Sequence, residues 1–161
     1  MSKMDNEKLD HLILETWTDF IDLKNKAELS EVLIPNSMPL LWFGDLAKYE
    51  KSDLKILTVS KNVSYAEFGE NQRYEKLLTE FSSVNLETYK SNLNRYFEYN
   101  PSPWFNQLAK FLPVFDSAYK ESENQINRAL HIDLFTPIAT HPVWPGLAKS
   151  CLLYTSDAAD E

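Results

Sequence analysis

Residues 55–64 read Lys55-Ile56-Leu57-Thr58-Val59-Ser60-Lys61-Asn62-Val63-Ser64. Residues 55–60 form a short, mainly apolar segment with β-branched side chains, which is typical of a strand buried in a parallel sheet. The strand runs directly into a polar turn over residues 61–64. A second strand of the same kind is predicted at Ala129–Leu134, and helical patterns separate the two. Strands that alternate with helices indicate an α/β fold with a parallel sheet.

Amphipathic helices are expected on either side of these strands. From Asp5, the expected N-cap, to Lys24, apolar residues recur at helical spacing. They are Leu9, Leu12, Ile13, Trp17, Phe20 and Ile21. Further helices are predicted within residues 25–36 and over Arg73–Phe81, Leu86–Phe97 and Pro103–Leu112. The segment Leu40–Asp45 fits a short strand or a loop. We predict that the first and last of these helices cover the two strands.

The last eleven residues, Cys151–Glu161, resemble the translation of a transposase adapter used in sequencing libraries. Such segments are excluded from reasoning about a fold. We therefore expect residues 1–150 to form a partial domain, with residues 151–161 as a non-native tail and the natural gene continuing past about Ser150. Cys151 then says nothing about redox compartment, metal binding or nucleophilic catalysis.

The 161 residues suffice for one ordinary domain. The net charge is −8, and because the tail holds three acids and no Lys or Arg, residues 1–150 carry −5. An anionic protein is a poor non-specific binder of nucleic acid, although a local basic groove can still bind it. No apolar run approaches ~18 residues and no signal-peptide core is present, so we expect a cytoplasmic protein without membrane contact. No metal, cofactor or obligate protein partner is predicted.

Two polar clusters follow the predicted strands, Ser60–Ser64 and Asp133–Thr140. In parallel sheets the ligand crevice lies beyond the carboxyl ends of the strands. Both clusters are therefore expected at the same ligand site.

Six segments carry a resemblance to a known family. They are Trp42-Phe43-Gly44-Asp45, Ile56–Ser60, Ser60-Lys61-Asn62-Val63-Ser64, Glu67-Phe68, Ala129–Leu134 and Thr136-Pro137-Ile138-Ala139-Thr140. In this order and spacing, over roughly residues 40–147, they resemble the uracil-DNA glycosylase superfamily. The resemblance implies a three-layer α/β/α fold with a short parallel sheet. It also implies that the full-length parent removes uracil or a related base from DNA by hydrolysing the N-glycosidic bond, as in base-excision repair.

Asn62 matches the residue with which this family positions a water against the glycosidic carbon of a flipped nucleotide. An Asn orients water by hydrogen bonds rather than acting as a strong base. The resemblance makes Ser60 and Ser64, in the same turn, substrate-binding residues. Two positions depart from the family, because Ser60 replaces its Gly and Val63 replaces its Pro, which puts glycosylase activity in question. Asn is also common in ordinary turns, where its side chain bonds the local backbone.

Asp133 occupies the strand-end position at which uracil-specific members carry an Asn that reads the pyrimidine edge. An ionised Asp only accepts hydrogen bonds, which suits an amino group such as that of cytosine; alternatively, Asp133 caps the next turn. Phe68 either stacks on an extruded base or belongs to the core. His131 alternates with Asp133 along the strand, and we predict a packed, hydrogen-bonded core histidine. Trp17, Trp42 and Trp104 are predicted to be core.

The family's second catalytic motif is a histidine in a late loop. The sequence His141-Pro142 lies too soon after the second strand to match it, so we expect this motif to be missing and the 161-residue chain to be inactive. Two alternatives to catalysis stay open. The chain is either a non-catalytic member of the family that binds a nucleobase or nucleic acid, or a structural α/β domain whose match to the family motifs is coincidental. The catalytic and binding hypotheses place Asn62, Phe68 and Asp133 around one pocket, whereas the structural hypothesis scatters them.

Overall fold

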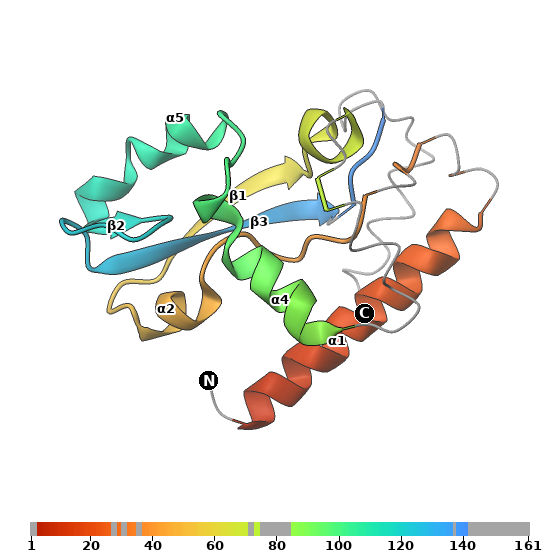
Figure 1. The fold of residues 1–161 in the computed structure, drawn as a ribbon, viewed down its shortest axis with the longest axis horizontal. Helices are drawn as coiled ribbons and strands as arrows, with labels where there is room; N and C mark the ends of the chain where they lie inside the picture. The colour runs from red at the N-terminus through yellow and green to blue at the C-terminus, as the bar shows by residue number, and fades with distance from the viewer. Residues whose placement is uncertain are drawn as a thin grey trace.

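The computed structural model describes residues 3–26, 29, 32–34, 37–70, 73–74, 85–136 and 138–141. Within this part of the chain, a three-stranded sheet has the order β1 (Ile56–Asn62), β3 (Asn127–Thr136), β2 (Ser117–Ala118). Both neighbouring pairs are parallel. The prediction that the two main strands are parallel neighbours is confirmed, and Figure 1 shows them running side by side.

The register of β1 and β3 decides which side chains share a face. Thr58 lies opposite His131 and Ser60 opposite Asp133. The register then shifts, so that Asn62 lies opposite Thr136. This irregularity adds one residue to β3 and changes the pairing where the two strands end.

Helices and single helical turns flank the sheet. The helices are α1 (Lys3–Lys24), α2 (Leu46–Lys51), α4 (Leu86–Asn94) and α5 (Phe105–Ala109), with single turns η2 (Ala66–Glu70), η3 (Tyr96–Glu98) and η4 (Leu112–Phe115). Together with the parallel sheet they make a small α/β fold. No helix among the described residues is long and apolar enough to cross a membrane.

Helix α1 differs from its prediction in its start and in its packing. It begins at Lys3, so Asp5 lies within the helix and is not its N-cap. Ile13, Trp17 and Phe20 are buried at helical spacing, as predicted, whereas Leu12 and Ile21, predicted on the same face, are exposed. The ring of Trp17 contacts Tyr89 of α4 at 5.9 Å. Helix α1 therefore packs beside α4 (Figure 1).

Helix α5 is shorter than the predicted Pro103–Leu112. Pro103 and Trp104 form a turn, the helix spans Phe105–Ala109, and the chain continues into η4. The ring of Phe105 lies 4.8 Å from His131. The helix therefore covers the sheet face that carries His131, as predicted. The helix predicted over Leu86–Phe97 ends at Asn94, and η3 follows it.

The segment Leu40–Asp45 is a loop that packs against β3. The backbones of Phe43 and His131 pair antiparallel, with N–O distances of 2.8 and 3.0 Å. Gly44 follows with φ +112°, and a Cβ there would lie 3.2 Å from the carbonyl oxygen of Ala129. A glycine is therefore required for both the backbone angle and the close approach. Asp45 then caps α2 by accepting from the Lys48 amide at 2.9 Å.

The opposite sheet face is open in the described structure. Leu57 is 44% exposed, Val59 48% and Leu134 64%. Three predicted segments lie partly or wholly outside the described residues. Of the helix predicted over Arg73–Phe81 only Arg73 and Tyr74 are described, and the segment 25–36 is described only in part. The tail Cys151–Glu161 lies wholly outside the described residues.

Candidate functional site

A cavity of about 410 Å³ lies where β1 and β3 end. It is lined by all five predicted site residues, Ser60, Asn62, Ser64, Phe68 and Asp133. Its other walls are Phe43, Val59, Lys61, Glu67, Tyr96, Trp104, Phe105 and His131. The structure therefore brings the predicted residues together instead of scattering them.

Strand alternation and register account for this grouping. Side chains two apart in a strand point to the same face, so Ser60 and Asn62 project together from β1. Asp133 joins them because it lies opposite Ser60 on β3. The turn after β1 leads into η2, which adds Glu67 and Phe68 to the wall.

A chain of polar side chains runs across the sheet and ends at Asp133. The Tyr119 hydroxyl lies 2.7 Å from Thr58 Oγ1, which lies 2.9 Å from His131 Nδ1. His131 Nε2 lies 3.2 Å from Ser60 Oγ, and the Ser60 hydroxyl donates to Asp133 Oδ1. The side chains of His131 and Asp133 are only 1% and 3% exposed. We call this chain the Tyr119–Asp133 relay, and the low exposure of His131 and Asp133 shields that end of it from solvent.

The hydrogen bond from Ser60 to Asp133 fixes the direction of the relay at its Asp133 end. Ser60 has one hydroxyl proton, and giving it to Asp133 requires His131 Nε2 to carry a proton of its own. Thr58 also has a single hydroxyl proton, and its Oγ1 lies within hydrogen-bonding distance of both the Leu130 carbonyl, at 3.1 Å, and His131 Nδ1, at 2.9 Å. Burial raises the pKa of Tyr119 to about 12, which keeps that hydroxyl protonated as a donor. The hydrogen bonds from His131 to Ser60 and from Ser60 to Asp133 therefore both point toward Asp133.

The turn after β1 is held by local hydrogen bonds. Asn62 Nδ2 donates to the Val63 carbonyl at 3.2 Å, as an ordinary turn asparagine does. Ser64 Oγ accepts from the Glu67 amide at 3.3 Å, and the Ser64 carbonyl accepts from the Phe68 amide at 3.0 Å. Val63 is 1% exposed, so its side chain anchors the turn to the core.

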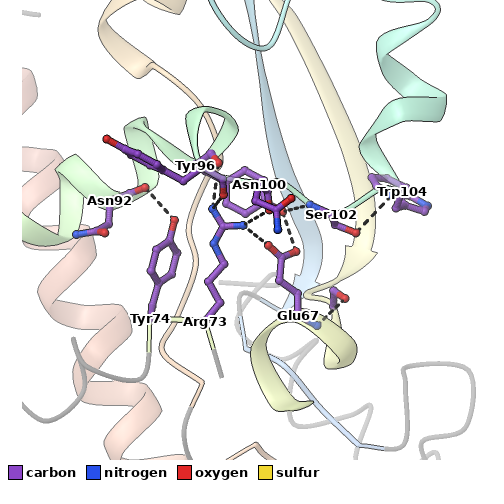
Figure 2. A network of polar contacts seen from close by, with 10 residues as sticks. Glu67, Arg73, Tyr74, Asn92, Tyr96, Asn100, Ser102 and Trp104 are labelled. Atoms are coloured by element: carbon purple, nitrogen blue, oxygen red, sulfur yellow. Dashed lines mark hydrogen bonds and ion pairs between the residues drawn. The ribbon is translucent and has the colours of Figure 1, made fainter. Parts of the chain in front are cut away.

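Glu67 is held by a largely but not fully buried ion pair. Arg73 Nη1 donates to Glu67 Oε1 at 2.5 Å, and the Tyr96 hydroxyl donates to Oε2 at 2.7 Å. Their side chains are 15% exposed for Arg73 and 12% for Glu67. Figure 2 shows the two side chains converging next to Tyr96. Arg73 also donates to the carbonyls of Tyr96, Tyr99 and Asn100, so its position is fixed from several sides.

Burial dominates the acid–base properties of this cluster. Desolvation raises the pKa of Glu67 above its ordinary 4.5, although the Tyr96 hydrogen bond and the Arg73 charge oppose the shift. Desolvation also raises the pKa of Tyr96, and the Glu67 charge adds to that rise. Burial thus favours the protonated form of the Glu67 carboxyl group.

The aromatic walls differ in how accessible they are. Phe68 is 1% exposed and packs in the core against Phe43 and Tyr74, with centroid distances of 6.1 and 6.0 Å. Trp104 was predicted to be core, and this is wrong, because it is 47% exposed and its ring lies 5.4 Å from His131. Trp17 and Trp42 are buried as predicted.

His131 and Glu67 are two of the eight lining residues that lie outside the predicted site. His131 is buried and hydrogen-bonded as predicted, but it also contributes to the wall. Glu67 was noted in the sequence only as part of a Glu-Phe pair. The strand alternation of His131 with Asp133 was a usable signal for the first. No local pattern indicated Glu67, because its partner Tyr96 is 29 residues away.

Asp133 does not cap the following turn through any contact among the described residues; instead its carboxylate accepts from Ser60. His141 is absent from the lining of this cavity, and its ring lies 4.4 Å from Tyr65. Among the described residues, no group of three or more His, Cys, Asp or Glu side chains is arranged to hold a metal ion.

No protein-family model, curated protein or solved structure matches this chain. The resemblance to the uracil-DNA glycosylase superfamily stays a prediction, and it depends on the motif residues between Trp42 and Thr140.

Proposed function

We propose that the cavity at the ends of β1 and β3 binds a nucleobase and that the full-length parent hydrolyses the N-glycosidic bond to that base. The observation that carries the proposal is the meeting of Asn62, Glu67 and Asp133 in one cavity with aromatic walls. Its volume of about 410 Å³ lies within the ~300–1,000 Å³ of small-molecule sites. Such sites combine apolar walls with a few convergent polar groups.

The three-layer arrangement of the glycosylase family is part of this proposal. Helix α5 covers one sheet face through Phe105 and His131. On the other face Leu57, Val59 and Leu134 are exposed. Parallel sheets are ordinarily covered on both faces, so these apolar side chains mark the surface on which a second helical layer packs.

Asp133 is the base-reading residue in this proposal. The relay makes Asp133 an acceptor of hydrogen bonds, since Ser60 already donates to it. A ligand must therefore present a donor, which favours an amino-bearing edge such as that of cytosine over the carbonyl of uracil. Trp104, half exposed at the rim, supplies the accessible aromatic surface on which a base stacks.

In the hydrolysis itself, water attacks the glycosidic carbon while the bond to the base nitrogen breaks and its electron pair leaves with the base. Asn62 orients the water through its side-chain oxygen, which has no hydrogen-bond partner among the described residues. Glu67, on the same wall, accepts the proton that the water loses. Its raised pKa supports this role, because desolvation makes the Glu67 carboxylate a stronger proton acceptor than an exposed one.

A non-catalytic nucleobase-binding protein is the second candidate. The observation that favours it is the Asn62 amide, which donates to its own turn at the Val63 carbonyl. In that arrangement the asparagine stabilises the turn, and the cavity still recognises a base through Asp133.

Binding and base release separate these functions. Titration calorimetry with free cytosine and uracil tests the cavity, and Asp133→Asn should reverse the preference while the exposed Asp116→Asn leaves it unchanged. Release of bases from single- and double-stranded DNA by the full-length parent tests catalysis. There, Asn62→Ala is expected to lower the rate at least a hundredfold. Failure of every nucleobase to bind would reject the proposal, and binding without release would leave the second candidate.

A further inference from the structure

A second cavity, of about 200 Å³, lies between α5, η4 and β2. Its walls are largely apolar and include Phe97, Phe105, Ala109, Leu112, Pro113 and Tyr119. The lining also includes the polar residues Asn106, Lys120 and Gln125. The cavity shares the Phe105 ring with the first cavity but none of that cavity's polar side chains. The two cavities can therefore be tested independently.

Ser117 supplies the unusual feature of this second cavity. It belongs to β2, lines the cavity and is 0% exposed. Among the described residues, its hydroxyl oxygen has no hydrogen-bond partner. Burying a hydroxyl without a partner costs free energy, and native structures keep few such groups. A ligand that fills the cavity and bonds this hydroxyl would remove that cost.

The cavity's shape and chemistry restrict the ligand. A cavity of roughly 150 Å³ lined by apolar side chains is large enough for benzene, and this one is somewhat larger. One ring therefore fits against Phe97, Phe105 and Leu112. The single buried hydroxyl matches one hydrogen-bonding group on that ring.

We propose that this second cavity is a binding site for a small neutral aromatic molecule that carries one hydroxyl group, which Ser117 recognises. The proposal does not depend on the function of the first cavity. Phenol and toluene are matched probes, because they have nearly the same shape and differ in one hydroxyl group.

The test measures the affinity of both probes by NMR titration of the 161-residue chain. The wild type is expected to bind phenol more tightly than toluene. Ser117→Ala should weaken phenol binding about five- to tenfold, the scale of one hydrogen bond, and leave toluene binding unchanged. Ser91→Ala, at an exposed position of α4, is the matched control and should change neither affinity.

Stability provides the second measurement. Because the Ser117 hydroxyl has no protein partner to lose, Ser117→Ala should unfold at the same urea concentration as the wild type or at a higher one. Loss of stability would show that the hydroxyl is already bonded and would overturn the proposal. A phenol preference that survives Ser117→Ala, or no binding of either probe, would overturn it as well.

Discussion

Glu67 carries one of the two carboxyl groups that line the cavity at the ends of β1 and β3, beside that of Asp133. Its pKa is raised above 4.5 in the folded protein, mainly by desolvation. The folded state therefore binds this proton more tightly than the unfolded state does. The stability that Glu67 gains by protonation is fully present below pH 4.5 and is lost as the pH rises through the folded-state pKa.

Glu67→Gln removes this titration while keeping a side chain of similar shape. As the pH falls from 7 toward 4.5, the free energy of unfolding of the wild type should rise relative to that of Glu67→Gln. Urea denaturation of both proteins at a series of pH values measures the difference, in which the other carboxyl groups cancel. A difference that stays constant over this range would show that burial does not control this carboxyl group.

Arg73 compensates the buried charge of Glu67, and its loss leaves a carboxylate without its partner. Arg73→Met is therefore expected to destabilise the protein by about 3–5 kcal/mol. Arg95→Met is the matched control, since Arg95 pairs with Glu98 at the surface, with both side chains about half exposed. Surface pairs contribute only ~0–1 kcal/mol. Similar losses for the two variants in urea denaturation would contradict the buried-pair interpretation.

The sequence was most informative about residues whose neighbours in the chain define their surroundings. Asn62 and Asp133 were located because Asn62 follows one recognisable strand and Asp133 lies at the end of the other. Trp104 was misplaced because an aromatic residue at helical spacing resembles a core residue, and only the turn at Pro103 turns it outward. Glu67 depends on Tyr96, a contact that the pattern around Glu67 does not contain.

At the level of strands, the Tyr119–Asp133 relay joins β1 to β3 through side chains as well as backbone. Thr58→Val keeps the shape of the strand but removes the hydroxyl that contacts Tyr119 and His131. Two buried groups then lose a partner, so we expect a loss of about 1–3 kcal/mol in urea denaturation.

Val59→Thr makes the reverse exchange one position along the same strand. Val59 is 48% exposed, so this change should stay within about 0.5 kcal/mol. If Thr58→Val is equally harmless, the relay does not contribute to stability and its hydrogen bonds are replaced by solvent.

The strands and the main helices could be predicted because burial leaves a periodic pattern in the sequence. The ends of the helices could not, because they depend on tertiary contacts. Helix α5 is reduced to Phe105–Ala109, where the ring of Phe105 packs on His131 and Tyr119. Leu12 and Ile21 fit the helical period of α1, yet the narrow contact of that helix with α4 leaves them exposed.

Over the molecule as a whole, apolar surface is unevenly distributed. The sheet face that carries Thr58 and His131 is covered by aromatic side chains, whereas Leu57 and Leu134 on the other face stay largely exposed. Strand β1 is also an edge of the described sheet. An exposed apolar face beside an edge strand favours pairing with another copy of the chain.

We therefore expect the chain to self-associate as its concentration rises, despite a net charge of −8. Replacing Leu57 and Leu134 by Lys should shift sedimentation velocity profiles toward the monomer, because charges on this face are costly to bury. Val114→Lys is the control, since Val114 is 80% exposed but lies on η4. If Val114→Lys produces the monomer and the double variant does not, association occurs through η4, and the open sheet face is not the surface that pairs.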